Sequence, residues 1–469
     1  MHLSCRLVGT VTSAFIIFSY LFYFVIDDEE TEQLLSRLLG NNLHMSAIYF
    51  DYINTEGLRL ISASACCPSL RIIQERVKKH HKSIKLLIAN KALCETIQSI
   101  CKACPNLTTL RLMLPSSNIN IDEVILTAAR YCPMIEVLPT ASVTTLGVDA
   151  LATIHTLKEL RLSSPGFTST AVQSVLISNP RLTDISLAGE YIDDSLVRCI
   201  GRHCGNLRSI SLLKDSPENS VVLSISVLYE FFCGCPLLEV VELSPLGENP
   251  TDTLRALFEY CHNLTDLVIY TGSQSNVSLL PIVAEPVLYT YNTSLTMLRI
   301  GALNMGPSAS WDRSLRDIFT YCIHLTSIYL ACCIHVTDEH ITLMTQNCCK
   351  LNSLELISCD NITIVGMLYV ATCCIHLETI DLTNMTVNDE FLMQLSLHFT
   401  SLTSLSIRCH KAVGVAYSIT EVGIHAVLQG CTGLTFLTVH GKMVESLYST
   451  LDLPRLGQIY PHITFDIGR

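Results

Sequence analysis

The sequence predicts an α/β solenoid, in which short parallel strands line a curved concave face and helices cover the convex face. One short apolar phrase recurs along most of the 469 residues, and its most regular copies follow one another at intervals of 25 or 26 residues. Hydrophobic residues make up 49% of the chain and charged residues only 15%. Because stacked repeats bury one continuous core, a chain of this length need not divide into domains of roughly 150 residues.

The recurring phrase has the form Cys-x-x-Leu-x-x-Leu-x-Leu, with Ile or Val at some apolar positions. Clear copies begin at Cys104, Cys204, Cys235, Cys261, Cys322, Cys348, Cys374 and Cys431, degenerate copies at Leu157, Leu182, Leu295 and Leu402, and weaker ones at Cys67 and Cys132. The most regular copies begin at Cys322, Cys348, Cys374 and Phe399, so that successive copies are 26, 26 and 25 residues apart. Leucine-rich repeats have periods of roughly 20–29 residues, so the phrase predicts a leucine-rich-repeat solenoid.

Each part of the phrase has a structural role. Two apolar residues two positions apart point to the same side of a strand, so the last two leucines of a copy face the core and the residue between them faces away. After the strand, apolar residues from Val336 to Met344 follow a helical spacing. The pair Thr337-Asp338 suits the N-cap and first turn of this helix. A strand, a turn and a helix therefore account for one period.

The residues from Cys322 to Ile341 resemble the cysteine-containing leucine-rich repeats, whose pattern is Cys-x-x-Leu-x-x-Leu-x-Leu-x-x-Cys-x-x-Ile-Thr-Asp-x-x-Leu. The matching positions are Leu325, Ile328, Leu330, Cys333, Val336, Thr337 and Asp338. The next repeat keeps the pattern but has Ile364 in place of Asp. The resemblance covers roughly residues 60–445. It implies a relation to F-box proteins, the substrate-binding subunits of SCF-type ubiquitin ligases, or to Amn-type proteins that carry the repeats without an F-box. Residues 27–60 contain neither the Leu-Pro start nor the Cys-Trp ending of an F-box.

Residues between the inward leucines are the candidate partner-binding positions, because rows of such residues form the extended binding surfaces of solenoids. We expect this concave row to consist of Arg299, Tyr329, Glu355, Asp381 and Ser406. Arg408 and His410, just beyond a strand, are expected to extend it.

The 22 cysteines are expected to be buried free thiols, because most occupy fixed positions of the repeat where a small apolar side chain is needed. Cys101 and Cys104 form a CxxC pair, but no second pair of ligands accompanies them, so we expect no metal and no cofactor. Six Asn-x-Ser/Thr sequons allow glycosylation if the repeats enter the secretory pathway, although two of them follow from the repeat phrase itself.

Residues 1–26 contain twenty uncharged, mostly apolar positions from Leu7 to Ile26, long enough to cross a bilayer. They predict either a single-pass membrane anchor or a hydrophobic N-terminal cap of the solenoid. We expect a helical cap or linker at 27–60, the repeats at 61–445 and a C-terminal cap at 446–469. The basic run 76–82 is interpreted as a solvated face rather than a lipid or nucleic-acid site.

A net charge of −12 and a single tryptophan disfavour nucleic-acid binding. No nucleophile, base and orienting group can be grouped, and no glycine-rich phosphate loop is found. The sequence therefore predicts a non-enzymatic scaffold that binds a protein substrate on its concave face, in the cytoplasm or nucleus, with a Skp-type adaptor and a cullin as further partners. The alternative is a membrane-anchored recognition protein whose repeats face the lumen or the outside.

Overall fold

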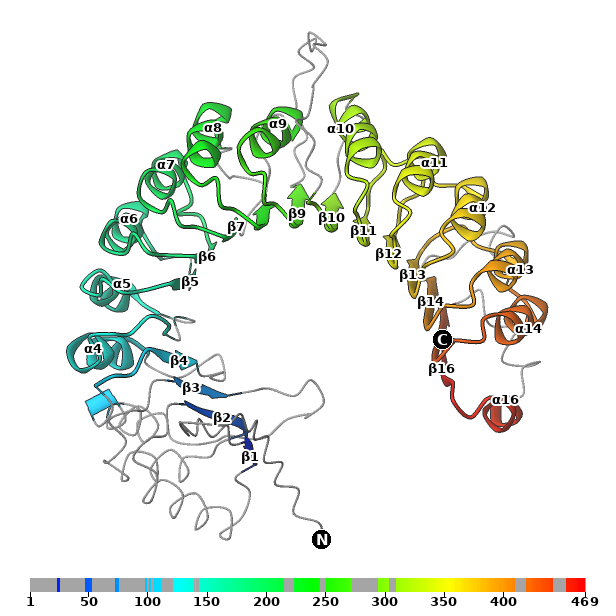
Figure 1. Ribbon diagram of the computed structural model, residues 1–469, viewed down its shortest axis with the longest axis horizontal. Coiled ribbons are helices and arrows are strands. Elements are labelled where there is room, and N and C mark those ends of the chain that lie inside the picture. The colour runs from blue at the N-terminus through cyan, green and yellow to red at the C-terminus, as the bar shows by residue number, and fades with distance from the viewer. Residues whose placement is uncertain are drawn as a thin grey trace, which may run out of the picture. The chain divides into compact units, whose positions relative to one another are not determined.

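The computed structural model describes the strands at 23–25, 47–52 and 72–75 and then residues 98, 101–102, 105–111, 121–138, 140, 143–164, 166–214, 223–244, 250–271, 294–302, 309–409, 419–441 and 453–468. The chain divides into two units, Met1–Asp215 and Ser216–Arg469. In both units, parallel strands and helices follow one another along the chain, and in most of the repeats one strand alternates with one helix (Figure 1).

The first unit begins with a parallel sheet of four strands in chain order, β1 (Tyr23–Val25), β2 (Ala47–Tyr52), β3 (Ile72–Glu75) and β4 (Thr109–Arg111). The following elements are, in chain order, α4 (Ile121–Tyr131), α5 (Thr145–Leu151), β5 (Glu159–Ser163), α6 (Ser169–Ser178), β6 (Asp184–Ala188), α7 (Asp194–His203) and β7 (Ser209–Leu213). The last three strands pair in parallel, each with the next in the chain.

The second unit repeats this alternation. Its strands are β8 (Val240–Ser244), β9 (Asp266–Thr271), β10 (Met297–Ala302), β11 (Ser327–Ala331), β12 (Ser353–Ile357), β13 (Thr379–Thr383), β14 (Ser404–Cys409), β15 (Phe436–Gly441) and β16 (Thr464–Gly468). Its helices are α8 (Ile225–Gly234), α9 (Pro250–Tyr260), α10 (Ala309–Tyr321), α11 (Asp338–Asn347), α12 (Ile364–Cys373), α13 (Asp389–His398), α14 (Glu421–Gly430) and α16 (Leu453–Ile459). Within this unit the strands lie along the inner, concave side and the helices along the outer side (Figure 1). The predicted leucine-rich-repeat solenoid is thereby confirmed.

In the strands from β5 to β15, the second and fourth residues form the core. In β12 these are Leu354 and Leu356, which are fully buried, whereas Glu355 between them is partly exposed. Met367 and Val370 of α12 are fully buried as well. The inside and outside positions assigned from the phrase are therefore correct.

Among the repeat cysteines, Cys322, Cys348 and Cys374 are buried beside this core, and none of the three forms a disulfide. Burial raises the pKa of the Cys322, Cys348 and Cys374 thiols to about 12. The Cys348 sulfur donates to the backbone carbonyl of Cys322 in the preceding repeat, at 3.8 Å. The thiols therefore pack as small apolar groups and supply a weak hydrogen bond between repeats.

Neighbouring helices are joined at their N-terminal ends by a recurring link of Asp, Thr and Gly, which we call the Asp–Thr–Gly link. In α11, the Asp338 carboxylate accepts hydrogen bonds from the Thr363 backbone N–H (2.8 Å) and hydroxyl (2.6 Å). Thr363 is the N-cap of α12. Gly366 makes room for the carboxylate, because a Cβ there would lie 2.4 Å from Asp338 Oδ1.

The same link occurs twice more among the described helices. Asp389 of α13 accepts from the backbone and hydroxyl of Thr420, the N-cap of α14, beside Gly423. In the first unit, Asp122 accepts from the backbone and hydroxyl of Thr144 beside Gly147. The link thus fixes one helix start against the next in both units.

Three residues just after successive strands, Cys332, Ser358 and Asn384, have φ angles of 55°, 49° and 55°. Each donates its backbone N–H to a carbonyl at the end of the following strand, on Ile357, Thr383 and Arg408 respectively. The left-handed conformation therefore extends the pairing of adjacent strands by one residue, at a steric cost to a residue with a Cβ.

The terminal segments differ in places from the prediction. Within 7–26, the described residues are Tyr23–Val25 and form β1, while the remainder lies outside the described residues. A strand, β2, occupies part of the segment expected to be a helical cap or linker, and β16 in 446–469 adds a further strand beside β15. Among the helices described, none has the length and apolar character to span a membrane. The weak copy at Cys132 forms a single bridge between Thr109 and Val137 rather than a strand.

Candidate partner-binding face

The predicted concave residues lie in one row across neighbouring strands. Strand pairing sets Arg299 opposite Tyr329, Tyr329 opposite Glu355, Glu355 opposite Asp381, and Asp381 opposite Ser406. We call this set, with its continuations, the central row. Adjacent strands are about 4.8 Å apart, so the five side chains succeed one another at that interval. Their role in binding stays a prediction.

The members of the central row differ in exposure. Arg299 is exposed, and Tyr329, Glu355 and Asp381 are half-buried. Ser406 is only 6% exposed, and its hydroxyl has no hydrogen-bond partner among the described residues. Ser406 therefore offers a partner less surface than its neighbours do.

Arg408 lies within β14 rather than beyond the strand, opposite Thr383. Its guanidinium Nη1 lies 2.9 Å from Asp381 Oδ2 and pairs with that carboxylate. The Thr383 hydroxyl also donates to Asp381, at 3.3 Å. The Asp381 charge is therefore largely satisfied within the protein. His410 lies outside the described residues.

The central row extends to β8 and β9 through two residues that the sequence analysis did not select. Pairing sets Glu242 opposite Val268, and Val268 opposite Arg299. Both Glu242 and Val268 are half-buried. The copies beginning at Cys235 and Cys261 contain both positions, so reading the middle residue of every copy would have found them.

Tyr270 is a third residue that the sequence analysis missed. It pairs with Gly301 of β10, and a Cβ on Gly301 would lie 2.8 Å from Tyr270 Cδ1 and 3.2 Å from Cε1. The Tyr270 ring therefore leans over β10 into the space that glycine leaves. It approaches the central row on the side where Arg299 lies.

Tyrosines from β9 and β11 thus flank the Arg299 strand. Burial, followed by the nearby Tyr270 phenol and the Glu355 carboxylate, raises the pKa of Tyr329, while the Arg299 charge acts in the opposite direction. The Tyr329 hydroxyl therefore stays protonated at neutral pH. Tyr and Arg are the residue types most enriched among those that dominate binding at protein interfaces.

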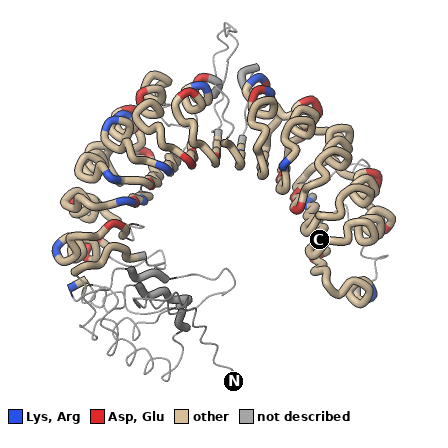
Figure 2. The backbone as a smooth tube through the Cα atoms, viewed as in Figure 1, with Lys and Arg blue, Asp and Glu red and all other residues tan. Residues whose placement is uncertain are grey.

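At the end of the unit the row continues with Thr438 of β15 and Asp466 of β16, which pair with one another. His440 Nε2 lies 2.9 Å from Asp466 Oδ1, beside this row. Acidic and basic positions are interspersed along the described part of the second unit, with no continuous basic strip (Figure 2).

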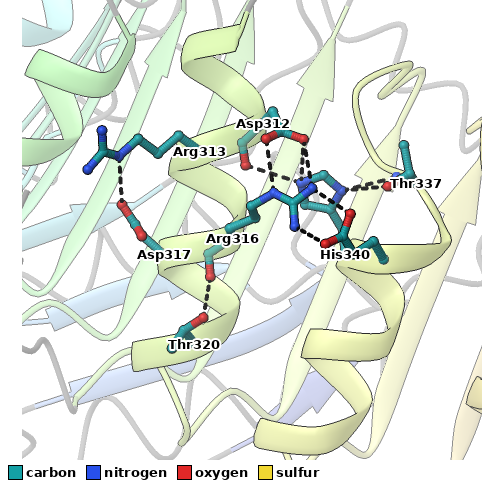
Figure 3. A network of polar contacts seen from close by, with 8 residues as sticks. Asp312, Arg313, Arg316, Asp317, Thr320, Thr337 and His340 are labelled. Carbon is teal, nitrogen blue, oxygen red and sulfur yellow. Dashed lines mark hydrogen bonds and ion pairs between the residues drawn. The ribbon is translucent and has the colours of Figure 1, made fainter. Parts of the chain in front are cut away.

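The helices of the second unit carry a separate polar network around His340 (Figure 3). Arg316 on α10 pairs with Asp312 on the same helix (2.9 Å) and with Glu339 on α11 (2.6 Å). His340 is fully buried, and its Nδ1 accepts from the Thr337 backbone N–H at 3.2 Å. Its Nε2–H donates to the Asp312 carbonyl at 3.1 Å.

Both ring nitrogens of His340 are therefore engaged inside the protein, and neither reaches solvent. Burial lowers the pKa of His340, so the ring is neutral in the folded chain at neutral pH. The network fixes α10 against α11 and completes the cap of α11. Among the described residues, no group of three or more His, Cys, Asp or Glu side chains is placed to hold a metal ion.

No protein-family model matches the chain. Among solved structures, it aligns with one from the yeast Rad7 and Elc1 complex at 15% identity, over 83% of this chain and 86% of the other, with a TM-score of 0.45. It also aligns with the leucine-rich repeat-containing protein LegL7 from Legionella pneumophila at 14% identity, over 72% and 94% of the two chains, with a TM-score of 0.37. A TLR13–ssRNA13 complex aligns at 13% identity over 93% of this chain but 59% of the other, with a TM-score of 0.31.

Proposed function

We propose that the chain is a non-enzymatic scaffold that binds a protein partner on the concave strand face of its second unit. The observation that carries this proposal is the central row, in which Glu242, Arg299 and Glu355 lie on every second strand and have no ion-pair or hydrogen-bond partner among the described residues. The buried Leu, Ile or Val residues on either side of each of these residues hold the backbone in register, so the row is preorganised for binding.

The test is a triple variant, Arg299→Ala, Tyr329→Ala and Glu355→Ala, used as bait against wild type in quantitative affinity capture from cells. We expect the partners of the wild-type chain to be lost, with an unchanged far-UV circular dichroism spectrum, because none of the three side chains is in the core. Alanine at Val365, Leu397 and Val422, which are 53%, 68% and 61% exposed on the helices, is the matched control and should leave capture unchanged. Loss with the helix variant and not with the strand variant would overturn the proposal.

For the cellular role, we propose a substrate receptor of an SCF-type ubiquitin ligase in the cytoplasm or nucleus. The resemblance of Cys322–Ile341 to the cysteine-containing repeats supports this role. A Skp-type adaptor and a cullin should co-purify with the full chain. A mobility shift on glycosidase treatment, lost on deleting 7–26, would instead place the repeats in the lumen and refute the ligase role.

A further inference from the structure

The charges of the central row alternate in sign at a regular interval. Reading from β8 to β12, the row consists of Glu242, Val268, Arg299, Tyr329 and Glu355. The charged residues occupy every second strand, in the order negative, positive, negative. With strands about 4.8 Å apart, successive charges are about 9.6 Å apart.

These three charges have no ion-pair or hydrogen-bond partner among the described residues, whereas Asp381 on the next strand is paired with Arg408. The unpaired part of the row therefore ends at Glu355. An occupant must supply the order positive, negative, positive at the same interval, because like charges facing each other across an interface are unfavourable.

We infer that the row binds a polyproline II segment of a protein partner in which a basic, an acidic and a basic residue are each separated by two residues. This inference rests on the proposed function and names the chemistry of its partner. A polyproline II helix has three residues per turn and a rise of about 3.1 Å, so every third residue returns to the same side after about 9.3 Å. That distance matches two strands.

Other conformations fit less well. In an extended β-segment, residues on one side recur every second position, after about 6.6 Å, and the third residue points away. In an α-helix, seven residues span about 10.5 Å, so the mismatch reaches nearly 2 Å over the full row. The polyproline II spacing keeps all three charges in register.

Tyr270 and Tyr329 strengthen the match. They flank Arg299 on the strands to either side, and Tyr270 leans into the space left by Gly301. Grooves lined by aromatic side chains are the usual binding sites of polyproline II segments, whose backbone is already ordered before binding. The tyrosines would contact the proline rings between the charged residues of the segment.

The probe is a fluorescein-labelled peptide, Lys-Pro-Pro-Glu-Pro-Pro-Lys, titrated with the full chain at low salt and followed by fluorescence anisotropy. Low salt is needed because exposed charge pairs are screened. We expect saturable binding that is at least about tenfold tighter than that of Lys-Pro-Glu-Pro-Lys, which has the wrong interval, and of Glu-Pro-Pro-Lys-Pro-Pro-Glu, which has the reversed charges.

Arg299→Glu should invert the preference, so that Lys-Pro-Pro-Lys-Pro-Pro-Lys binds more tightly than the original probe. Gly301→Ala should weaken binding of the original probe several-fold, because it displaces Tyr270. Arg255→Glu, on α9 and paired there with Asp252, is the matched control and should leave the preference unchanged. Equal binding of the matched and mismatched peptides, or no inversion by Arg299→Glu, would overturn the inference. If the peptides fail while the triple alanine variant still loses its cellular partners, the proposed function stands without this inference.

Discussion

Replacing Gly366 with alanine tests the Asp–Thr–Gly link most directly. A Cβ at this position would lie 2.4 Å from Asp338 Oδ1 and 3.2 Å from Ile362 Cγ2. The carboxylate must move, and its two hydrogen bonds to Thr363 are lost or lengthened. At a net of about 0.5–1.5 kcal/mol each, these bonds together contribute about 1–3 kcal/mol.

Alanine also favours the helix by up to about 1 kcal/mol relative to glycine, so the two effects oppose one another. We expect Gly366→Ala to lower the free energy of unfolding by about 1–2 kcal/mol. In an Asp338→Ala background the clash is absent, and the same substitution should be neutral or stabilising. Urea unfolding followed by circular dichroism measures the sum, and hydrogen exchange of the α12 amides locates the effect.

Gly457→Ala provides the matched control, because a Cβ on this residue of α16 would meet nothing within 4 Å. This change should stabilise the chain slightly. If Gly366→Ala and Asp338→Ala prove additive within about 0.5 kcal/mol, the two residues are not coupled and the link does not exist as described.

Three further predictions concern single residues. Cys332→Gly should raise the free energy of unfolding in urea by about 1 kcal/mol, because glycine adopts the 55° φ without steric cost. Ala331→Gly, at the end of the preceding strand, should instead lower it. A lower stability for Cys332→Gly than for Ala331→Gly would contradict the argument from backbone strain. Burial lowers the pKa of His340, so the unfolded chain binds a proton near pH 6.5 that the folded chain does not. The free energy of unfolding should therefore fall as the pH drops from about 6.5 towards the lowered pKa, and His340→Asn should reduce this slope; an unchanged slope in that variant would contradict the assignment. At about pH 8, iodoacetamide should label the exposed Cys349 and Cys373 in the native chain. Cys348 and Cys374 should stay unlabelled until urea is added, because they are buried and their thiol pKa values are about 12. Labelling of all four cysteines at one rate, measured by peptide mass spectrometry, would show that Cys348 and Cys374 are not buried.

The repeat phrase was sufficient to predict the strands and their inward residues, because a period of two in a strand leaves little choice once both leucines are known. Glu355 between Leu354 and Leu356 is an example. The same reasoning predicted the row, since repeats of equal length bring equivalent positions side by side. The helix start at Thr337 also followed from local chemistry.

Two placements depend on neighbouring strands: Tyr270 was not selected from the sequence, and Arg408 was selected but expected just beyond its strand. Tyr270 and Arg408 come after the last leucine or isoleucine of their phrases, and pairing with adjacent strands decides that β9 and β14 continue through them. The placement of Tyr270 further depends on Gly301 in another repeat. Burial of Ser406 likewise arises from its surroundings rather than from its own repeat, where it occupies the same position as Glu355.

Each Asp–Thr–Gly link takes its Asp from one repeat and its Thr and Gly from the next. A single excised repeat therefore contains only part of a link. Among α11 to α14, the link joins α11 to α12 and α13 to α14, but α12 begins with Ile364 and offers no carboxylate to α13. We therefore expect helix pairs, rather than single repeats, to be the smallest cooperative units of this part of the chain. Partial unfolding should therefore begin at the junction of α12 and α13, and slow-exchanging amides should lose their protection in pairs of helices.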